Sequence, residues 1–358
     1  MGKRILIVGG SGSISGVPIY VEHLRKALSS NEIYVMSDIN EGGFNHLKNS
    51  ASYIEVEGLS SERFLILNVI TIIKKIKNHL QLISPDVVWA NSTITVFLFR
   101  IISLFHDFRL IVTYHGVPFG PGRGLLRSVI AYCADLLTSL ITPQTVVIIS
   151  NGDKRLTRWS CPFHKKIILP NPLQLSSDQL KQRHLNTPEY KLVMITRDHY
   201  QKNLDYAAEL TGCSDDFHLY IYGGVSIERQ TYLRKIAKDR VTFFGIVPNA
   251  AKFLKNFDLM LLTSRYEGLP FCGLEALGTG LALAMTRVGG FEELAENNSF
   301  LIELRGDLEG DVKKIKEMIT LYRKREINIF EVQVLSRRYN IYNWRETINE
   351  IIDDSART

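Results

Sequence analysis

Hydrophobic residues fall into short continuous runs that alternate with longer amphipathic segments. In the first half of the chain, strands are predicted at 4–8, 32–36, 86–90, 109–114 and 145–150, and helices at 17–29, 63–82 and 124–139. The strand runs are almost wholly apolar, which favours a parallel sheet covered on both faces.

The alternation breaks at the polar stretch 170-PNPLQLSSDQLKQRHLNTPEY-190, which holds three prolines, and then starts again. Strands are predicted at 191–196, 217–223, 240–245, 257–263 and 281–286, and helices near 203–211, 226–238, 248–256, 271–278, 307–324 and 343–354. Two such blocks predict two doubly wound α/β domains, 1–170 and 191–339, joined by a linker at 171–190. Ligands are expected at the carboxyl ends of the strands.

Composition indicates the general class of protein. The chain has 358 residues, 45% of them hydrophobic and 22% charged, which is typical of a globular protein with a large core. Its four cysteines are scattered without metal-ligand spacing, which fits a reducing compartment and argues against a zinc site. No signal peptide is visible, and the apolar stretches 93–105 and 125–142 contain charges that argue against membrane spans.

A glycine-rich loop, 9-GGSGSISG-16, directly follows the first predicted strand and leads into a helix. Small residues there let a ligand approach the backbone, and a helix N-terminus offers amides to an anion. The spacing is not G-x-G-x-x-G, so a dinucleotide-binding fingerprint is a poor match.

Two cations follow the first strand of the second block. Arg197 and Lys202 lie in 195-ITRDHYQKN-203 at an expected open cleft, where they could grip a diphosphate. Two ordinary surface cations at a loop are the alternative.

The stretch 264-SRYEGLPFCGLEALGTG-280 places Glu267 and Glu275 on either side of a turn with helix-breaking residues. The predicted strand-turn-helix aims the backbone amides of Phe271, Cys272, Gly273 and Leu274 at one spot, an anion-binding nest. Glu275, in the first helical turn, could accept ribose hydroxyls, and Glu267 is expected to be free to hold another polyol. A capping carboxylate and a surface glutamate would be the purely structural interpretation.

Together these stretches resemble the retaining, nucleotide-sugar-dependent glycosyltransferases of family four, which have the GT-B fold. Glu267 and Glu275 match the E-x(7)-E motif of that family, and Arg197 and Lys202 match its basic pair. The stretches 9–24, 112-VTYHG-116, 241-VTFFGIVP-248 and 289-GGFEEL-294 are similar to further family motifs, and 342–352 resembles its terminal helix.

The resemblance implies a role for each matching residue. Gly16 would lie against the donor phosphate, and Arg197 and Lys202 would hold the diphosphate. Glu275 would bind the ribose and Glu267 the transferred sugar. His115 would lie near the anomeric side of that sugar, although outside this motif a core histidine would be the simpler interpretation. Residues 340–358 would pack back onto the first domain.

The resemblance also implies the reaction, which is transfer of a sugar, hexosyl or related, from a nucleoside diphosphate sugar with retention of configuration. Pro270 stands two places earlier than the family pattern has it, and Leu281 stands where proline is common, which leaves the donor sugar open. UDP is the expected donor nucleotide, and no cofactor or metal is expected because the basic pair can stabilise the leaving group. A sugar-nucleotide 2-epimerase of the same fold is the alternative enzyme.

The basic charge is concentrated in the first half. Residues 1–190 hold 20 Lys and Arg against 13 Asp and Glu, whereas residues 191–358 hold 23 against 24. The segment 63–83 combines apolar residues with Lys74, Lys75 and Lys77, so it could rest on an anionic membrane leaflet or be an ordinary core helix. No nucleic-acid-binding motif accompanies the charge. In the family that the chain resembles, the first domain usually takes the acceptor, so the charge would lie where a lipid-linked glycan enters. The resemblance therefore implies a cytoplasmic, peripheral enzyme of surface polysaccharide or lipopolysaccharide biosynthesis with a glycan or lipid-linked acceptor. A soluble small-molecule acceptor is the alternative.

Overall fold

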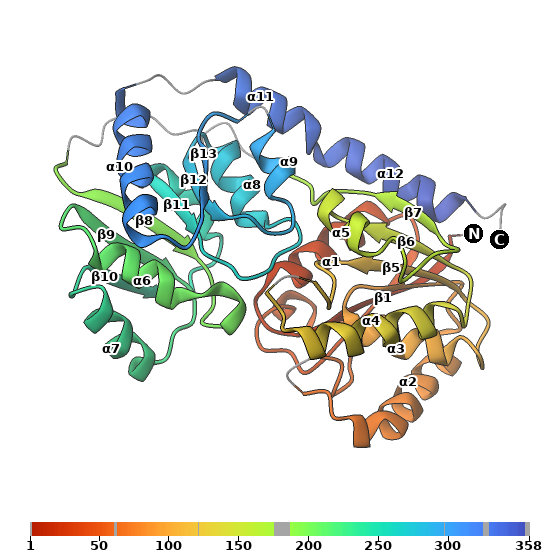
Figure 1. The fold of residues 1–358 in the computed structure, drawn as a ribbon. Coiled ribbons are helices and arrows are strands. Elements are labelled where there is room, and N and C mark those ends of the chain that lie inside the picture. The colour runs from red at the N-terminus through yellow and green to blue at the C-terminus, as the bar shows by residue number, and fades with distance from the viewer. Residues whose placement is uncertain are drawn as a thin grey trace. The chain divides into compact units, whose positions relative to one another are not determined.

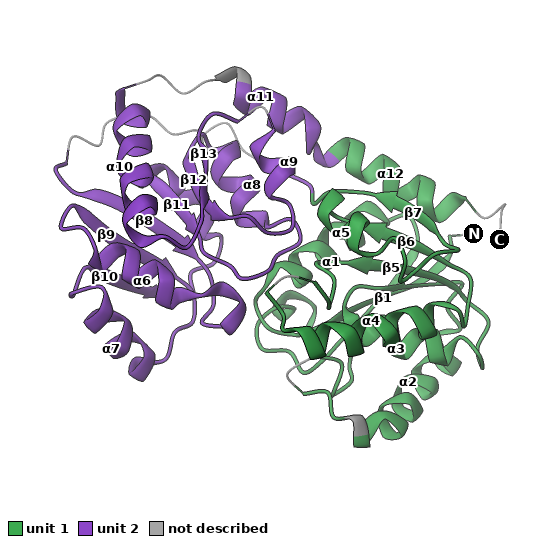
Figure 2. Cartoon of the chain, in the orientation of Figure 1, with its two compact units in different colours: residues 1–171, 342–358 green, residues 172–341 purple. Residues whose placement is uncertain are grey.

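The computed structural model describes residues 2–60, 63–120, 122–174, 187–296, 298–324 and 329–354. The chain divides into two compact units, shown in Figure 2. Unit 1 is Met1–Asn171 with Tyr342–Thr358, and unit 2 is Pro172–Ile341. Residues 175–186 of the predicted linker lie outside the described residues.

Unit 1 is built on a seven-stranded parallel sheet in the order β3-β2-β1-β4-β5-β6-β7 (Figure 1). Its strands are β1 (Arg4–Gly10), β2 (Glu32–Ser37), β3 (Tyr53–Glu55), β4 (Val87–Ala90), β5 (Arg109–Tyr114), β6 (Gln144–Ile148) and β7 (Lys165–Ile168). Its helices are α1 (Gly16–Ala27), α2 (Val69–Ile83), α3 (Thr93–Ile102), α4 (Leu125–Ser139) and α5 (Asn151–Leu156), followed at the end of the chain by α12 (Ile341–Asp353).

Unit 2 has a six-stranded parallel sheet in the order β10-β9-β8-β11-β12-β13. Its strands are β8 (Tyr190–Ile195), β9 (Phe217–Tyr222), β10 (Val241–Gly245), β11 (Leu259–Leu262), β12 (Ala282–Thr286) and β13 (Leu301–Leu304). Its helices are α6 (Leu204–Gly212), α7 (Ile227–Ile236), α8 (Phe271–Gly278), α9 (Phe291–Ala295), α10 (Leu308–Lys324) and α11 (Ile329–Arg338).

In each sheet the strand order reverses direction once. This happens between β1 and β4 in unit 1, and between β8 and β11 in unit 2. Ligands of doubly wound sheets bind outside the carboxyl ends of the strands at such a point. The glycine-rich loop follows β1, the basic pair follows β8, and the stretch with Glu267 follows β11. Three of the motifs found in the sequence therefore lie at the two switch points.

The last helix belongs mostly to unit 1. Trp344 is 4% exposed and packs edge-on against Tyr20 of α1, with ring centroids 5.5 Å apart. Near the end of α12, the carbonyl of Ile352 accepts hydrogen bonds from Lys3 Nζ at 2.6 Å and from Arg109 at 3.1 Å. These contacts tie the C-terminal helix to β1 and β5.

Some predicted elements are wrong or were not foreseen. The helix predicted at 63–82 begins only at Val69, and the segment predicted as a helix at 248–256 is a 3-10 helix, Ala250–Asn256. Strands β3, β7 and β13 went unpredicted because these three- and four-residue edge strands are mostly half-buried or exposed and carry no continuous apolar run. Helix α3 was missed because most of its residues are buried, so it lacks the polar face that marks an amphipathic helix.

Candidate active site

The turn after β8 is hydrogen-bonded to the residues that follow β11. Thr263 Oγ1 donates to the carbonyls of Lys202 and Asn203, each at 3.0 Å. Asn203 has a left-handed backbone, φ 51°, and separates a short 3-10 turn at Tyr200–Lys202 from α6. Arg265 N–H donates to the carbonyl of Gln201 at 2.7 Å. The Lys202 backbone is thus held beside the stretch that carries Glu267.

The side chains of Lys202 and Glu267 form an ion pair. Ser264 Oγ donates to Glu267 Oε1 at 2.8 Å, and Gln201 Nε2 donates to Glu267 Oε2 at 3.2 Å. Gln201 Nε2 also donates to the carbonyl of Tyr266 at 2.9 Å. The expectation that Glu267 is free is therefore wrong, because both of its carboxylate oxygens are occupied and its side chain is 9% exposed.

The ion pair fixes the charge of the lysine. Burial disfavours the Lys202 cation, but the Glu267 carboxylate more than offsets this and raises the pKa of Lys202, while nearby Arg197 opposes the rise. Lys202 is therefore charged at neutral pH, and the charge of Arg197 is near enough to affect it. Its side chain is 21% exposed, so the cation is more enclosed than an open cleft would make it.

Helix α8 begins at Phe271 as predicted, with Pro270 as its N-cap and without a side-chain cap. The amide of Leu274 donates to the carbonyl of Pro270 at 3.2 Å. That amide belongs to the helix ladder, so Leu274 is wrongly placed in the predicted anion nest. The amides of Phe271, Cys272 and Gly273 precede the first ladder bond, and helix amides in these positions can receive an anion.

Glu275 is the fifth residue of α8, one position beyond the first turn in which it was expected. The described residues give its carboxylate neither a hydrogen bond nor an ion pair, and burial raises the pKa of Glu275 to about 7. Burial likewise raises the pKa of the Cys272 thiol to about 12. A half-buried carboxylate without a protein partner is suited to accept hydroxyl donors from a ligand.

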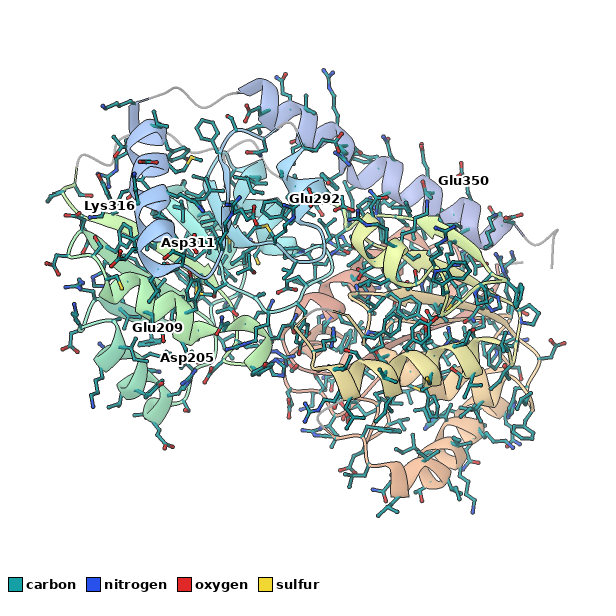
Figure 3. The ribbon with its side chains drawn as sticks, viewed as in Figure 1. Asp205, Glu209, Glu292, Asp311, Lys316 and Glu350 are labelled. Carbon is teal, nitrogen blue, oxygen red and sulfur yellow. The ribbon has the colours of Figure 1, made fainter. Side chains whose placement is uncertain are left out.

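Two contacts of this site were not found from the sequence. Gly289 has φ 42°, and a Cβ there would lie 2.0 Å from the carbonyl oxygen of Glu267, so only glycine fits. Arg229 of α7 donates to Asp198 Oδ1 at 3.4 Å and to Asp205 Oδ2 at 2.6 Å, and so bridges the two ends of the turn that holds Lys202. Figure 3 labels Asp205 on α6. The motif 289-GGFEEL-294 could have pointed to Gly289, whereas Arg229 lies outside every motif found in the sequence.

Unit 1 holds the other two predicted site residues. Gly16 is the exposed first residue of α1, and Ser15 before it makes no side-chain cap. His115 follows β5 and lies edge-on to Tyr20 with ring centroids 4.5 Å apart. Burial lowers the pKa of His115 to about 3, and its Nε2 has no hydrogen-bond partner among the described residues. His115 is therefore neutral, and the core-histidine interpretation leaves this buried nitrogen unexplained.

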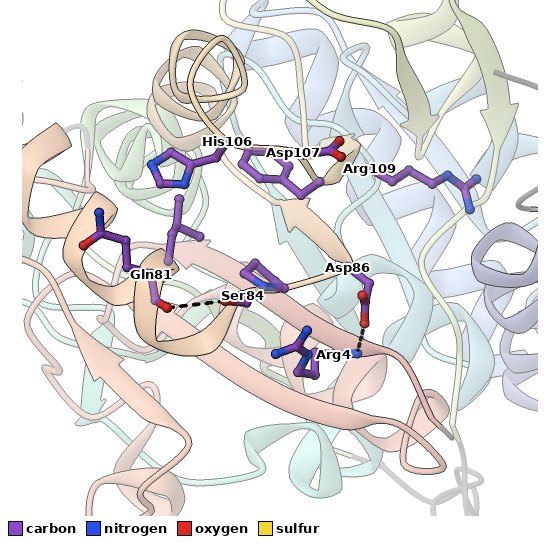
Figure 4. Close-up of a pocket in the computed structure, with 10 residues that line it drawn as sticks. Arg4, Gln81, Ser84, Asp86, His106, Asp107 and Arg109 are labelled. Carbon is purple, nitrogen blue, oxygen red and sulfur yellow. Dashed lines mark hydrogen bonds between the residues drawn. The ribbon is translucent and has the colours of Figure 1, made fainter.

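A cavity of about 600 Å³ in unit 1 does not coincide with any of these residues. It lies at the amino ends of the strands and is lined by Arg4, Asp86, His106 and Arg109 among others (Figure 4). Arg4 Nη1 donates to the carbonyl of Ile83 at 3.0 Å, and Arg109 is bound to Ile352. Since both arginines hold the fold together, we do not assign this cavity to the reaction.

Comparison with known proteins relates the second unit to a known family. Residues 189–320 match the family model described as glycosyl transferases group 1. The chain is 25% identical over 354 residues to the O-antigen biosynthesis glycosyltransferase WbnH of Escherichia coli, with 98% of this chain and 99% of that protein covered.

Solved structures establish the fold of the whole chain. Sucrose-phosphate synthase from Thermosynechococcus elongatus superposes with a TM-score of 0.77 at 15% identity, covering 98% of each chain. HepE from Anabaena, in complex with UDP and glucose, superposes with a TM-score of 0.76 at 16% identity, covering 98% of this chain and 100% of HepE. The predicted GT-B fold, with two Rossmann-like domains, is confirmed.

Proposed function

We propose that this glycosyltransferase moves a hexosyl or related sugar from a nucleoside diphosphate sugar, UDP-linked, to a glycan or lipid-linked glycan with retention of configuration. The observation that carries the proposal is the cluster at the β8–β11 switch point. There Lys202 and Glu267 are paired beside Arg197, and the helix start and Glu275 follow directly in the chain. The cluster offers cations for a diphosphate and a carboxylate for hydroxyl groups.

Each residue then has a chemical task. Arg197, Lys202 and the first amides of α8 stabilise the nucleoside diphosphate as its bond to the sugar breaks. One well-placed donor of this kind contributes roughly 3–4 kcal/mol to transition-state stabilisation. Glu275 accepts hydrogen bonds from the ribose, and Glu267 contacts the sugar while orienting Lys202. In unit 1, we assign Gly16 to the donor phosphate and His115 to the anomeric side of the sugar.

Retention follows from the family resemblance. No carboxylate is assigned as a covalent nucleophile, because Glu267 is engaged by Lys202, Ser264 and Gln201. We propose instead that the acceptor attacks from the face that the diphosphate leaves, with the departing phosphate taking the acceptor proton. The cations make a metal or other cofactor unnecessary for this step.

The relatives suggest the pathway and the donor. WbnH is named for O-antigen biosynthesis, and HepE was solved with UDP and glucose. We therefore propose surface polysaccharide or lipopolysaccharide biosynthesis on the cytoplasmic face of a membrane, with a peripheral enzyme and a lipid-linked acceptor. No helix in the described part of the chain is long and apolar enough to cross a membrane. A soluble acceptor and a 2-epimerase of the same fold are the competing proposals.

A two-stage experiment tests the function. Thermal shift is measured first with UDP, GDP, ADP and UDP-sugars, because ligands of the native state raise the melting temperature. Lys202→Ala should lose the shift, while Lys255→Ala, an exposed lysine of the same unit, should keep it. If none of these nucleotides raises the melting temperature, the donor assignment is contradicted.

The second stage uses the UDP-sugar with the largest shift and a membrane extract as acceptor source. We expect free UDP together with a labelled, extended acceptor. In this product the transferred sugar should keep the anomeric configuration that it had in the donor. An epimerised sugar nucleotide without transfer would establish the epimerase instead, and inverted configuration would overturn the retaining mechanism.

A further inference from the structure

Helix α4 of unit 1 buries polar residues and exposes apolar ones, although Ala131 and Tyr132 pack against the core. Its fully buried positions are polar, namely Asp135, Thr138 and Ser139. Its solvent-exposed positions form an apolar stripe at helical spacing, consisting of Leu126, Ile130, Cys133, Leu137 and the following Leu140. Leu126, Ile130 and Leu137 are between 61% and 73% exposed. A surface helix ordinarily turns its apolar face to the core.

A buried polar network holds the helix in this orientation. Arg100 of α3 is 1% exposed and donates to Asp135 Oδ1 at 2.7 Å and to Thr138 Oγ1 at 3.1 Å. Tyr114 of β5 donates its hydroxyl to Asp135 as well. Rotating α4 to bury its leucines would leave the Arg100 charge without its partner, which costs several kcal/mol. The apolar stripe is therefore fixed on the outside.

The segment between β6 and β7 is hydrogen-bonded to the end of α4 and carries further exposed aromatic residues. Ser139 Oγ donates to the carbonyl of Ser160 at 2.8 Å, and His164 is hydrogen-bonded to the carbonyl of Ser139 at 2.7 Å. Between and beside these contacts, Trp159 and Phe163 are 64% and 83% exposed. We call the exposed side chains of α4 together with Trp159 and Phe163 the α4 surface.

The segment of the chain that carries the α4 surface is basic. Residues 120–168 contain seven Lys and Arg against two Asp, and both aspartates, Asp135 and Asp153, are buried. Arg127, Lys154, Arg155 and Arg158 are all exposed. Arg158 lies over the Trp159 ring, 5.1 Å from its centroid. Tryptophan with apolar side chains and cations is the composition of a surface that lies in a lipid headgroup region.

We infer that the α4 surface docks onto an anionic lipid bilayer, with α4 lying in the plane of the interface. A second copy of the chain is the less favourable occupant, because a symmetric contact through this surface would bring like charges together. Helix α2, the segment first considered for this role, buries Ile72, Ile76 and Leu80 and exposes Lys74 and Lys75, as an ordinary core helix does. The inference rests on the proposed function in one respect only, namely that the acceptor is lipid-linked. The lipid-binding surface itself is argued independently of that function.

Tryptophan fluorescence provides a direct test with the whole protein. Of the three tryptophans, Trp89 is fully buried and Trp344 is 4% exposed, so Trp159 is the one that a membrane can reach. Vesicles of phosphatidylcholine, with and without phosphatidylglycerol, are added at low and high salt. We expect a blue shift and quenching by brominated acyl chains with the anionic vesicles at low salt, and a weaker response with the neutral ones.

A double variant, Leu126→Gln with Ile130→Gln, should lower partitioning into anionic vesicles by about tenfold or more, since two apolar side chains no longer enter the interface. Leu82→Gln is the matched control, an 83% exposed leucine on α2 that should leave binding unchanged. Because all three positions are exposed, the melting temperatures should stay close to that of the unaltered protein.

Equal partitioning of the double variant and the unaltered protein, or no response to anionic vesicles, would overturn the inference. A concentration-dependent dimer in light scattering that the same double variant abolishes would identify a second copy as the occupant. The UDP thermal shift in the double variant keeps the two proposals separate. Loss of vesicle binding with an intact shift is expected, and vesicle binding by a protein without any nucleotide shift would defeat the proposed function alone.

Discussion

At the scale of single residues, the pairing of Lys202 with Glu267 changes how both are understood. A lysine that meets a leaving diphosphate must be charged and correctly placed, and the carboxylate secures both conditions. The same pairing makes each residue part of the structure. Removing either one leaves a poorly solvated charge behind, so catalytic and structural effects must be measured apart.

Lys202→Ala should lower kcat roughly a hundredfold or more, the usual scale for losing one charge-stabilising group. It should also lower the melting temperature, because Glu267 then lacks its cation. Combining Lys202→Ala with Glu267→Gln should restore part of the stability and none of the activity. Steady-state kinetics and thermal melts of both variants check this. If folded Lys202→Ala turns over like the unaltered enzyme, the diphosphate assignment is wrong. Arg197→Ala should lower kcat by a similar factor to Lys202→Ala.

Glu275 predicts a dependence on pH. Burial raises the pKa of Glu275 to about 7 from 4.5, so the folded state prefers the neutral acid. The free energy of unfolding should therefore fall as the pH rises from 4.5 through 7. Glu275→Gln cannot ionise, and above pH 7 it should be more stable than the unaltered protein by about 1.4 kcal/mol for each pKa unit of the shift.

Urea unfolding at pH 4.5 and pH 8 measures this difference, which should vanish at the lower pH. At pH 8, where Glu275 is ionised, the nucleotide thermal shift should be smaller in Glu275→Gln, because the ribose loses a charged acceptor. A variant with an unchanged nucleotide shift would separate Glu275 from the donor.

At the scale of elements, the site depends on how a turn is held between two strands. On one side, the turn 196–203 is held by Thr263, which donates to the carbonyl of Lys202, and by its own Gln201, which donates to the carbonyl of Tyr266. On the other side it is held by Arg229 of α7, which pairs with Asp198 and Asp205. The proposed catalytic role of Lys202 needs such support, since a displacement of about 1 Å can cost up to a hundredfold in rate. We therefore propose that Arg229 is a positioning residue for Lys202.

Arg229→Ala should raise the KM for the donor or lower kcat by about tenfold, less than loss of Lys202 itself. Arg229→Lys should recover only part of this, because one ammonium cannot bridge two carboxylates as a guanidinium does. Arg240→Ala is the control, since its partner Asp215 is an exposed residue in the same unit. Kinetics of Arg229→Ala and Arg229→Lys that match those of Arg240→Ala would assign Arg229 to stability alone.

At the scale of the whole molecule, each unit carries its own switch point and its own share of the candidate site residues. Unit 2 holds the cations and carboxylates, whereas unit 1 holds Gly16, His115 and the α4 surface. The charge is divided in the same way, because the excess of basic residues lies in the first half of the chain. The cations and carboxylates proposed for the donor and the proposed membrane contact therefore lie in different units and can be altered independently.

Transfer should proceed without an added divalent ion. No group of three or more His, Cys, Asp or Glu side chains within the described ranges is arranged to hold a metal, and the proposed cations already meet the phosphates. Activity is measured after dialysis against EDTA, and then with magnesium or manganese restored. An unchanged rate is expected, whereas loss in EDTA with recovery in metal would assign phosphate neutralisation to an ion.

The sequence by itself determined most of the alternation of strands and helices and the place of the candidate site residues after strands. Apolar runs at β1, β5, β8 and β11 must be buried, and in parallel sheets the segments after such runs gather at one edge. Glycine and proline at 268–270 keep the chain out of a helix until α8 begins at Phe271. The candidate site residues could be proposed because local signals mark strand ends.

Only the tertiary structure decided which side chains meet and which faces are covered. Lys202 and Glu267 lie 65 positions apart in the chain, so their pairing depends on β8 lying next to β11. The periodicity of α4 reveals an apolar stripe but not the side on which it lies. Arg100, 35 positions earlier, settles that by drawing Asp135 inward, because a buried charge needs its partner more than leucines need the core.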